Sequence, residues 1–153
     1  MDFKIKKGVL KRYKDEKDVR EIFIPENIDI IGEGAFSNCV NLVRVLVPES
    51  VQIISDTAFS GCENLKTISL PEKTVKIGWY AFRGCRNLSD LTIPSGVKEI
   101  GKFAFMGCRR LAAVKVLHNG SVHKVLLKGE LTDESWQKIR RSFMAQDNKD
   151  MAV

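Results

Sequence analysis

The chain has 153 residues, of which 44% are hydrophobic and 29% are charged, which is enough for one globular domain with a real core. No stretch approaches the roughly 18 apolar residues of a membrane helix, and the N-terminal residues lack the apolar core of a secretion signal. The net charge of +6 is too small to indicate nucleic-acid binding by itself.

Residues 1–18 are predicted to form a β-hairpin that caps one end of the fold. The dipeptide Lys7-Gly8 separates two short runs, Phe3-x-Ile5 and Val9-x-Lys11-x-Tyr13, which are predicted to be the two strands of a small hairpin. Val19 and Ile22 then begin an incomplete coil of the repeat that follows.

Residues 19–116 contain a leading partial coil and four 23-residue repeats, and this periodicity decides the fold. Every proline and every cysteine of the chain lies 23 residues from the next, and the Ala-Phe pairs keep the same step. The recurring positions are Pro25, Pro48, Pro71 and Pro94, Cys39, Cys62, Cys85 and Cys108, and Phe36, Phe59, Phe82 and Phe105.

Each repeat is predicted to end in a short strand, because its last apolar residues alternate and a proline without an N–H follows. The residue before each cysteine is glycine in three repeats and Asn38 in the first, which predicts a left-handed backbone with positive φ. The column of Gly32, Ser55, Gly78 and Gly101 suggests the same conformation, although Ser55 interrupts it.

These residues resemble the BspA-like leucine-rich repeat, a family of the leucine-rich repeat superfamily. Its pattern Ile-Gly-x-x-Ala-Phe-x-Gly-Cys-x-x-Leu-x-x-Ile-x-Ile-Pro fits residues 31–48, 54–71, 77–94 and 100–116, with local departures at Ser55, Thr74 and Arg110. The resemblance implies a leucine-rich-repeat solenoid with right-handed coils and one parallel β-sheet.

Coils of this size must stack, because a single coil cannot bury its own apolar edge. Stacking places equivalent residues in columns, so we expect the four repeat phenylalanines to form a buried aromatic spine. In the second repeat the inward residues are predicted to be Val51, Ile54, Ala58, Phe59, Cys62, Leu65, Ile68 and Leu70.

Residues 117–153 are predicted to cap the other end. An Asn-Gly pair at 119–120 predicts a tight hairpin turn, with His118 opposite Ser121 and His123 opposite Val116. A helix is expected over about 133–145, followed by a frayed tail at 146–153. Its apolar face, Trp136, Ile139 and Phe143, should close the solenoid; the alternative is that this face binds a partner.

The cysteines and histidines raise the question of a metal or catalytic site. Stacked coils would place the four sulfurs in a row, whereas zinc needs four ligands within about 2.3 Å of one ion, so we expect buried thiols rather than zinc or disulfides. His118 and His123 could form a two-histidine metal site or an acid–base pair, but no third group is predicted beside them. No phosphate-binding or hydrolase motif is present, so we expect neither a cofactor nor an enzyme.

Two surfaces are candidates for binding. The first, the ridge, consists of outward residues on the predicted parallel strands. The second, the aromatic–arginine patch, lies in residues 71–116, which carry nine basic and three acidic residues, whereas residues 22–70 carry two basic and six acidic ones. The ridge residues are Arg44, Leu46, Thr67, Ser69, Asp90, Thr92 and Lys115, and the patch residues are Trp79, Tyr80, Arg83, Arg86, Phe103, Arg109 and Arg110.

The sequence therefore predicts a non-enzymatic module for protein–protein interaction or adhesion, whose partner is another protein. BspA-like proteins are often bacterial surface proteins that adhere to host proteins, and the resemblance implies a similar role. The alternatives are polyanion or nucleic-acid binding through the basic half, which the charge favours less, and a purely structural segment of a larger surface protein. We expect no membrane insertion, a cytoplasmic protein if the chain is complete, and a surface or secreted one if it is part of a longer chain.

Overall fold

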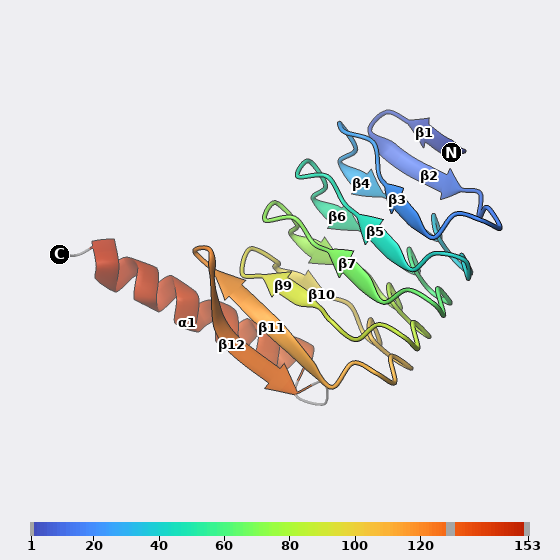
Figure 1. The fold of residues 1–153 in the computed structure, drawn as a ribbon. Coiled ribbons are helices and arrows are strands. Elements are labelled where there is room, and N and C mark those ends of the chain that lie inside the picture. The colour runs from blue at the N-terminus through green and yellow to red at the C-terminus, as the bar shows by residue number, and fades with distance from the viewer. Residues whose placement is uncertain (1, 128–130, 152–153) are drawn as a thin grey trace.

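The protein is a β-solenoid with a hairpin at one end and a hairpin and a helix at the other, as predicted (Figure 1). The structure, a computed structural model, describes residues 2–127 and 131–151. We number the coils from 1 to 4 by the cysteine that each contains, so coil 1 contains Cys39 and coil 4 contains Cys108.

Each complete coil contributes one short strand to each of two sides of the solenoid. On the ridge side lie β3 (Glu21–Phe23), β5 (Arg44–Leu46), β7 (Thr67–Ser69), β9 (Thr92–Pro94) and β11 (Ala113–His118). On the opposite side, here called the back, lie β4 (Ile30–Ile31), β6 (Ile53–Ile54), β8 (Lys76–Ile77) and β10 (Glu99–Ile100). The ends are formed by β1 (Phe3–Lys6), β2 (Val9–Tyr13), β12 (Ser121–Leu127) and α1 (Asp133–Met151).

The expectation of one parallel sheet was wrong in two respects. The back carries its own sheet, in the order β1-β2-β4-β6-β8-β10, and the ridge is divided into two sheets, β3-β5-β7 and β12-β11-β9. Each complete coil advances the parallel register by 23 residues, as in Arg44↔Thr67 and Ile53↔Lys76. The back strands span only two residues each, so no alternation of side chains revealed them in the sequence.

Buried columns run through the interior, and the predicted aromatic spine is confirmed. The rings of Phe36, Phe59, Phe82 and Phe105 stack with centroid separations of 4.8, 5.3 and 5.5 Å. The stack continues into the N-terminal hairpin through Tyr13, whose ring centroid lies 5.4 Å from that of Phe36. The predicted inward residues of the second repeat are buried, except Leu70, which is only half-buried.

One of the two predicted left-handed columns is confirmed. Asn38, Gly61, Gly84 and Gly107 all have positive φ, between 59° and 77°. The same expectation for the column that includes Gly101 was wrong. Those residues have ordinary φ values, and the three glycines instead allow close approach between coils.

A Cβ atom at Gly101 would lie 2.4 Å from the backbone nitrogen of Trp79 in the previous coil. The second left-handed column is the one two positions further along the chain, where Gly34, Thr57, Tyr80 and Phe103 have φ values between 54° and 61°. Three of these four residues carry side chains, so nothing in the amino-acid types indicated this backbone conformation.

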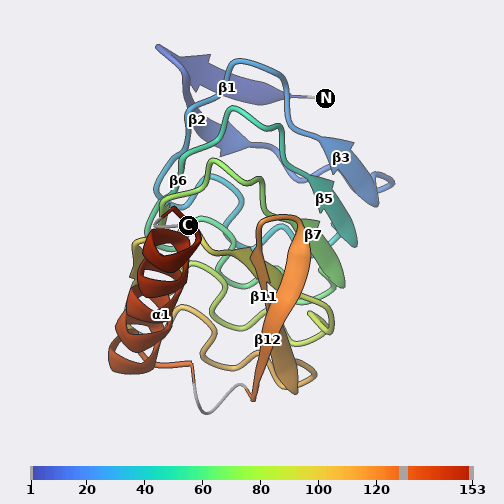
Figure 2. The same cartoon turned by 90° about the vertical axis from the view of Figure 1, so that its left-hand side faces the viewer.

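The C-terminal helix closes one end of the solenoid. Trp136 is fully buried, and its Nε1–H donates to the carbonyl oxygen of Val97 at 2.7 Å. Figure 2 looks onto this end and shows α1 beside the β11–β12 hairpin. The prediction that residues 146–153 fray was wrong for the described ones, because α1 continues to Met151; residues 152 and 153 lie outside the described part of the chain.

The β11–β12 hairpin contains an irregularity that the sequence did not predict. His118 pairs with Ser121 as expected, but the register shifts between Val116 and Leu117. As a result Lys124 rather than His123 lies opposite Val116. The bulge places His123 outside the regular pairing, so the predicted diagonal histidine pair is not supported by the strand register.

Candidate binding surfaces

Six of the seven ridge residues predicted from the sequence lie together around one open hollow of about 460 Å³. Lys115 is the exception, one strand further along the ridge. The apolar parts of the lining come from β5, β7 and the residue after β7. The six residues are Arg44, Leu46, Thr67, Ser69, Asp90 and Thr92.

The hollow lies where the ridge ladder is interrupted between β7 and β9. These strands share only the bridge Thr67↔Asp90 and belong to different sheets. Between β3 and β5, Ile24 N–H donates to the carbonyl oxygen of Leu46 at 3.0 Å. The equivalent bond from Leu70 to Thr92 is not formed in the described ladder, and at the step between them Val47 N–H lies 3.5 Å from Ser69 Oγ instead. The lining therefore includes backbone groups of two sheet edges that face one another.

Two oppositely charged side chains frame the hollow. Arg44 lies 3.6 Å from Glu21, and Asp90 lies 3.8 Å from Lys115, in pairs that join adjacent coils. All four side chains are about half exposed, so each pair contributes little to stability and can rearrange. The hollow thus presents a cation on one side, an anion on the other and hydroxyl groups between them.

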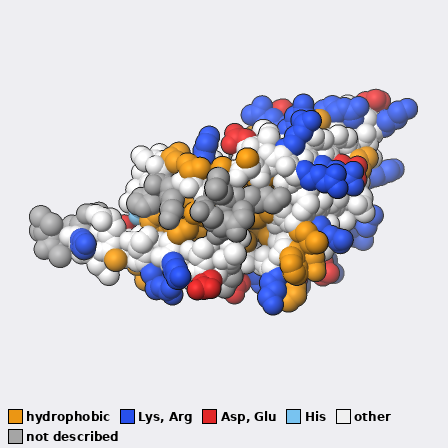
Figure 3. Space-filling model, turned by 90° about the horizontal axis from the view of Figure 1, so that it is seen from below, with side chains coloured by type: hydrophobic (Ala, Val, Ile, Leu, Met, Phe, Trp, Pro, Cys, Tyr) orange, Lys and Arg blue, Asp and Glu red, His pale blue; other side chains and the backbone are white. Residues whose placement is uncertain are grey.

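The aromatic–arginine patch lies on the turns that lead from the back to the ridge. Trp79 and Phe103 are 52% and 56% exposed, and the Tyr80 and Phe103 rings stack at 5.5 Å. Arg83 lies over the Tyr80 ring, 5.5 Å from its centroid. Figure 3, in which the molecule is seen from below, shows hydrophobic side chains gathered in patches among Lys and Arg.

Not every arginine of the patch joins this aromatic group. Arg86 pairs with Glu63 of the preceding coil at 3.9 Å, and Arg109 and Arg110 are exposed on coil 4. The basic side chains therefore follow the turns of two coils rather than converging on one point. Such an arrangement provides a broad contact surface instead of a pocket for a single anion.

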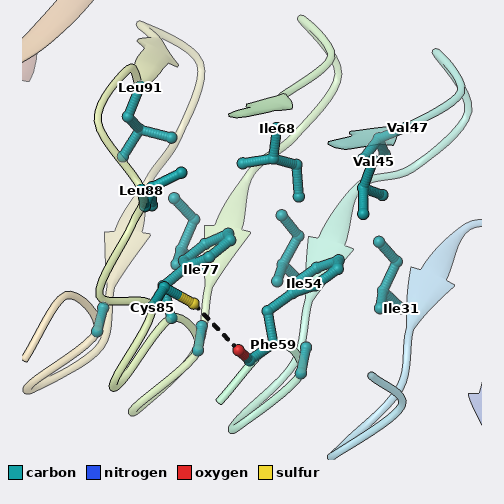
Figure 4. Packing of buried hydrophobic residues seen from close by; sticks show 14 of the residues in the cluster. Ile31, Val45, Val47, Ile54, Phe59, Ile68, Ile77, Cys85, Leu88 and Leu91 are labelled. Atoms are coloured by element: carbon teal, nitrogen blue, oxygen red, sulfur yellow. Dashed lines mark hydrogen bonds between the residues drawn. The ribbon is translucent and has the colours of Figure 1, made fainter. Parts of the chain in front are cut away.

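The four cysteines are buried thiols that hold neighbouring coils together. Cys62, Cys85 and Cys108 each donate to the carbonyl oxygen of the repeat phenylalanine one coil earlier, at 3.0, 3.2 and 3.1 Å. Figure 4 shows the bond from Cys85 to Phe59 within the packed interior. Burial raises the pKa of the Cys39 thiol to about 12, so it is protonated and unreactive at neutral pH.

His118 has two partners that the sequence did not place beside it. Ser95 Oγ lies 2.7 Å from its Nδ1, Asp147 Oδ1 lies 3.1 Å from its Nε2, and its ring stacks on Phe143. Asp147 was missed because residues 146–153 were expected to fray. Ser95 was missed because the residue after the repeat proline is glutamate in the other three repeats.

A serine, a histidine and an aspartate in contact also occur in hydrolases, but this group is arranged as a docking contact. The His118 side chain is only 13% exposed, in the seam between the last coils and α1. The backbone N–H of Ser95 donates to Leu117 at 2.7 Å and so is not available to stabilise an oxyanion. The contact fixes the second half of the helix against β11.

The described residues contain neither a metal-binding cluster nor a membrane-spanning helix. No group of three His, Cys, Asp or Glu side chains among residues 2–127 and 131–151 could hold a metal ion. Within the same residues, no helix combines the length and the apolar character needed to cross a bilayer.

Comparison with solved structures gives bacterial leucine-rich repeat proteins. A leucine-rich repeat protein from Bacteroides ovatus is 41% identical, with 69% of this chain matching 28% of that chain at a TM-score of 0.63. The T. pallidum leucine-rich repeat protein is 31% identical over 69% of this chain and 62% of that one, at a TM-score of 0.52. The pneumococcal vaccine antigen PcpA is 26% identical over 76% of this chain and 29% of that one, at a TM-score of 0.70.

This chain therefore matches less than two thirds of each of these three proteins. No curated protein gave a significant match. Residues 11–125 match the family described as the BspA type leucine rich repeat region, in six copies. Repeats of this kind commonly mediate protein interaction or adhesion and are generally not enzymes. The chain belongs to the BspA-type leucine-rich repeat family.

Proposed function

We propose that this protein is a non-enzymatic binding module that holds an extended segment of a partner protein in the ridge hollow. The observation that carries the proposal is the convergence of six ridge residues on a hollow where the parallel ladder opens. Along most of the described ladders, neighbouring coils satisfy each other's backbone groups; Val47 N–H, which lies 3.5 Å from Ser69 Oγ, is an exception. Here β7 and β9 leave groups that another backbone can bond.

An extended peptide fits this chemistry because its N–H and C=O groups can pair with an exposed strand edge. Thr67, Ser69 and Thr92 offer hydroxyl groups beside those edges. Arg44 and Asp90 can exchange their exposed ion pairs for an acidic and a basic side chain of the peptide, which would set its direction. The partner is thus recognised by backbone pairing together with two charges.

A displayed peptide library tests this proposal directly. Peptides are selected on the wild-type protein, and their affinities are then measured for Thr67→Arg, which fills the hollow, and for Arg109→Glu as a control on the patch. We expect selected peptides to bind Thr67→Arg at least tenfold more weakly and Arg109→Glu almost unchanged. Recovery of peptides that bind Thr67→Arg as well as wild type would overturn the assignment of the hollow.

A further inference from the structure

The turn side of the solenoid, residues 33–41, 56–64, 79–87 and 102–110, changes systematically from coil 1 to coil 4. These are the segments that lead from the back to the ridge in each coil. Because the coils repeat every 23 residues, each position on the turn side forms a column of four residues. The columns that face inward keep one residue type, whereas the outward columns change in both charge and size.

The charge changes sign along two of these columns. One begins with Glu33 in coil 1 and ends with Lys102 in coil 4, and both side chains are exposed. Another passes from Glu63 in coil 2 to Arg86 in coil 3, and Arg109 follows in coil 4. Neither Glu33 nor Lys102 forms a salt bridge with any residue in the described part of the chain.

The size changes in the same direction. Gly34 in coil 1 occupies the same column as Phe103 in coil 4, and Ser37 occupies the same column as Met106. Phe103 and Met106 are 56% and 50% exposed. Coil 1 therefore has small residues where coil 4 has large apolar ones.

The large residues occupy a backbone position that suits glycine. Tyr80 and Phe103 have φ values of 54° and 57°, a conformation that is costly for a bulky residue and easy for glycine, which coil 1 has at this position. The same backbone carries threonine in coil 2, tyrosine in coil 3 and phenylalanine in coil 4, so the conformation belongs to the coil. Coils 3 and 4 therefore place aromatic side chains where this backbone favours glycine.

We propose that the turn side binds a second copy of this chain with the two solenoids antiparallel. A two-fold axis that crosses the columns places each column against itself in reverse order, so coil 1 faces coil 4 of the second copy and coil 2 faces coil 3. Glu33 then faces Lys102 of the other copy, and Glu63 and Arg86, which pair within each chain at 3.9 Å, can exchange partners between the two copies. Gly34 and Ser37 leave room for the Phe103 and Met106 side chains.

The reverse order is essential to the match. A parallel arrangement would place each coil against the same coil of the second copy, with basic turns on basic turns and large residues on large residues. Four coils at about 4.8 Å each give a small surface. We therefore expect a weak dimer, with a dissociation constant in the micromolar range and a strong dependence on salt.

Analytical ultracentrifugation with charge-reversal variants tests the proposal. Across a range of protein concentrations at low salt, we expect a monomer–dimer equilibrium that weakens in 0.5 M NaCl. Lys102→Glu and Glu33→Lys, each alone, should raise the dimer dissociation constant at least tenfold. The double variant in one chain, and a mixture of the two single variants, should restore it, because each arrangement again opposes unlike charges.

Arg141→Glu, at an exposed position of α1, is the matched control and should leave the equilibrium unchanged. Circular dichroism melts of every variant exclude loss of fold as the cause. A protein that stays monomeric at all concentrations would overturn the proposal. Binding of a different, acidic partner to the same face by a monomeric protein would overturn it too. A dimer whose affinity does not respond to Lys102→Glu, or is not restored by the double variant, would overturn it as well.

Discussion

The back and the ridge of this solenoid are built by the same 23-residue repeat, yet they differ in continuity. On the back, the ladder runs without a break from β2 to β10. On the ridge, the ladder divides between β7 and β9. The two sides have the same number of residues per coil, so repeat length cannot explain the difference.

The difference in ladder continuity follows from the side chains that lie beside the backbone on each side. The back adjoins the aromatic spine and the thiol column, where every coil has the same residue and stacks on the next in the same way. On the ridge, the outward residues vary, and Val47 N–H is 3.5 Å from the side-chain Oγ of Ser69. A solenoid can therefore vary one side, here the ridge, for binding. The other side, the back with the spine and thiol column beside it, is here called the uniform side and maintains the stack.

The largest expected effect concerns the thiols of the uniform side and is seen on raising the pH. The folded pKa of Cys39 is about 12, and burial also raises that of Cys62, whereas an unfolded cysteine has a pKa of about 8.5. Between these values the unfolded state ionises and the folded state does not, so stability is full below about pH 8.5 and falls as the pH rises.

At pH 10 the loss is about 2 kcal/mol for each such thiol, and several thiols act together. Urea denaturation between pH 7 and 10 measures this loss. Cys62→Ala should lower stability at pH 7 but reduce the slope above pH 8.5. An unchanged slope in Cys62→Ala would contradict the assignment of the effect to buried thiols.

The second-largest loss of stability is expected when one ring of the aromatic spine is removed. Phe82 is fully buried between Phe59 and Phe105, so Phe82→Ala leaves a cavity and should cost about 3–5 kcal/mol in free energy of unfolding. Thr92→Ala on the ridge is the comparison and should cost less than about 1 kcal/mol. The free energy of unfolding of both variants is measured by urea denaturation. Equal losses would show that the spine does not stabilise the fold more than the ridge does.

The recurring interior residues beside the back were the part that the sequence predicted well, although the back strands themselves were missed. The spine, the buried thiols and the positive φ of Asn38 each follow from a residue type that recurs at one position, because stacking imposes the same demand on every coil. The family resemblance added the solenoid architecture. The position of Trp136 against the last coil followed from the apolar face of its helix.

What the sequence did not reveal depends on contacts between segments without a recurring residue. The ridge divides between two neighbouring coils, where Asp90 pairs with Thr67 only through an isolated bridge. A residue pattern shared by all four repeats does not reveal a change between two of them. Helix α1 extends past residue 145, and in this extension Asp147 contacts His118, which lies 29 residues earlier. The ridge residues lie on one surface of the solenoid, but their convergence on a hollow required the ladder to open.

A smaller loss of stability is expected when a methyl group is added to Gly101, on the back. Gly101→Ala would place a Cβ atom 2.4 Å from the backbone nitrogen of Trp79, and backbone cannot move aside as a flexible side chain can. The coils must separate locally, at a cost of about 1–3 kcal/mol. Ser55→Ala is the control in the same column, because a Cβ atom is already present there, and should change stability by less than about 0.5 kcal/mol. A neutral Gly101→Ala would contradict the close approach of coils 3 and 4.

The smallest effect concerns single hydrogen bonds and tests the comparison most directly. Gly101 N–H donates to Ile77 at 2.8 Å on the back, whereas Leu70 N–H lacks the equivalent ladder bond to Thr92 on the ridge. We expect native-state amide exchange at Leu70 and Thr92 to be at least about tenfold faster than at Gly101. A peptide bound in the hollow should slow exchange at Leu70 and Thr92 and leave Gly101 unchanged, because only the ridge amides gain a partner. Equal protection on both sides in the free protein would mean that the ridge ladder is continuous in solution, and the hollow would then lack the strand edges on which peptide binding depends.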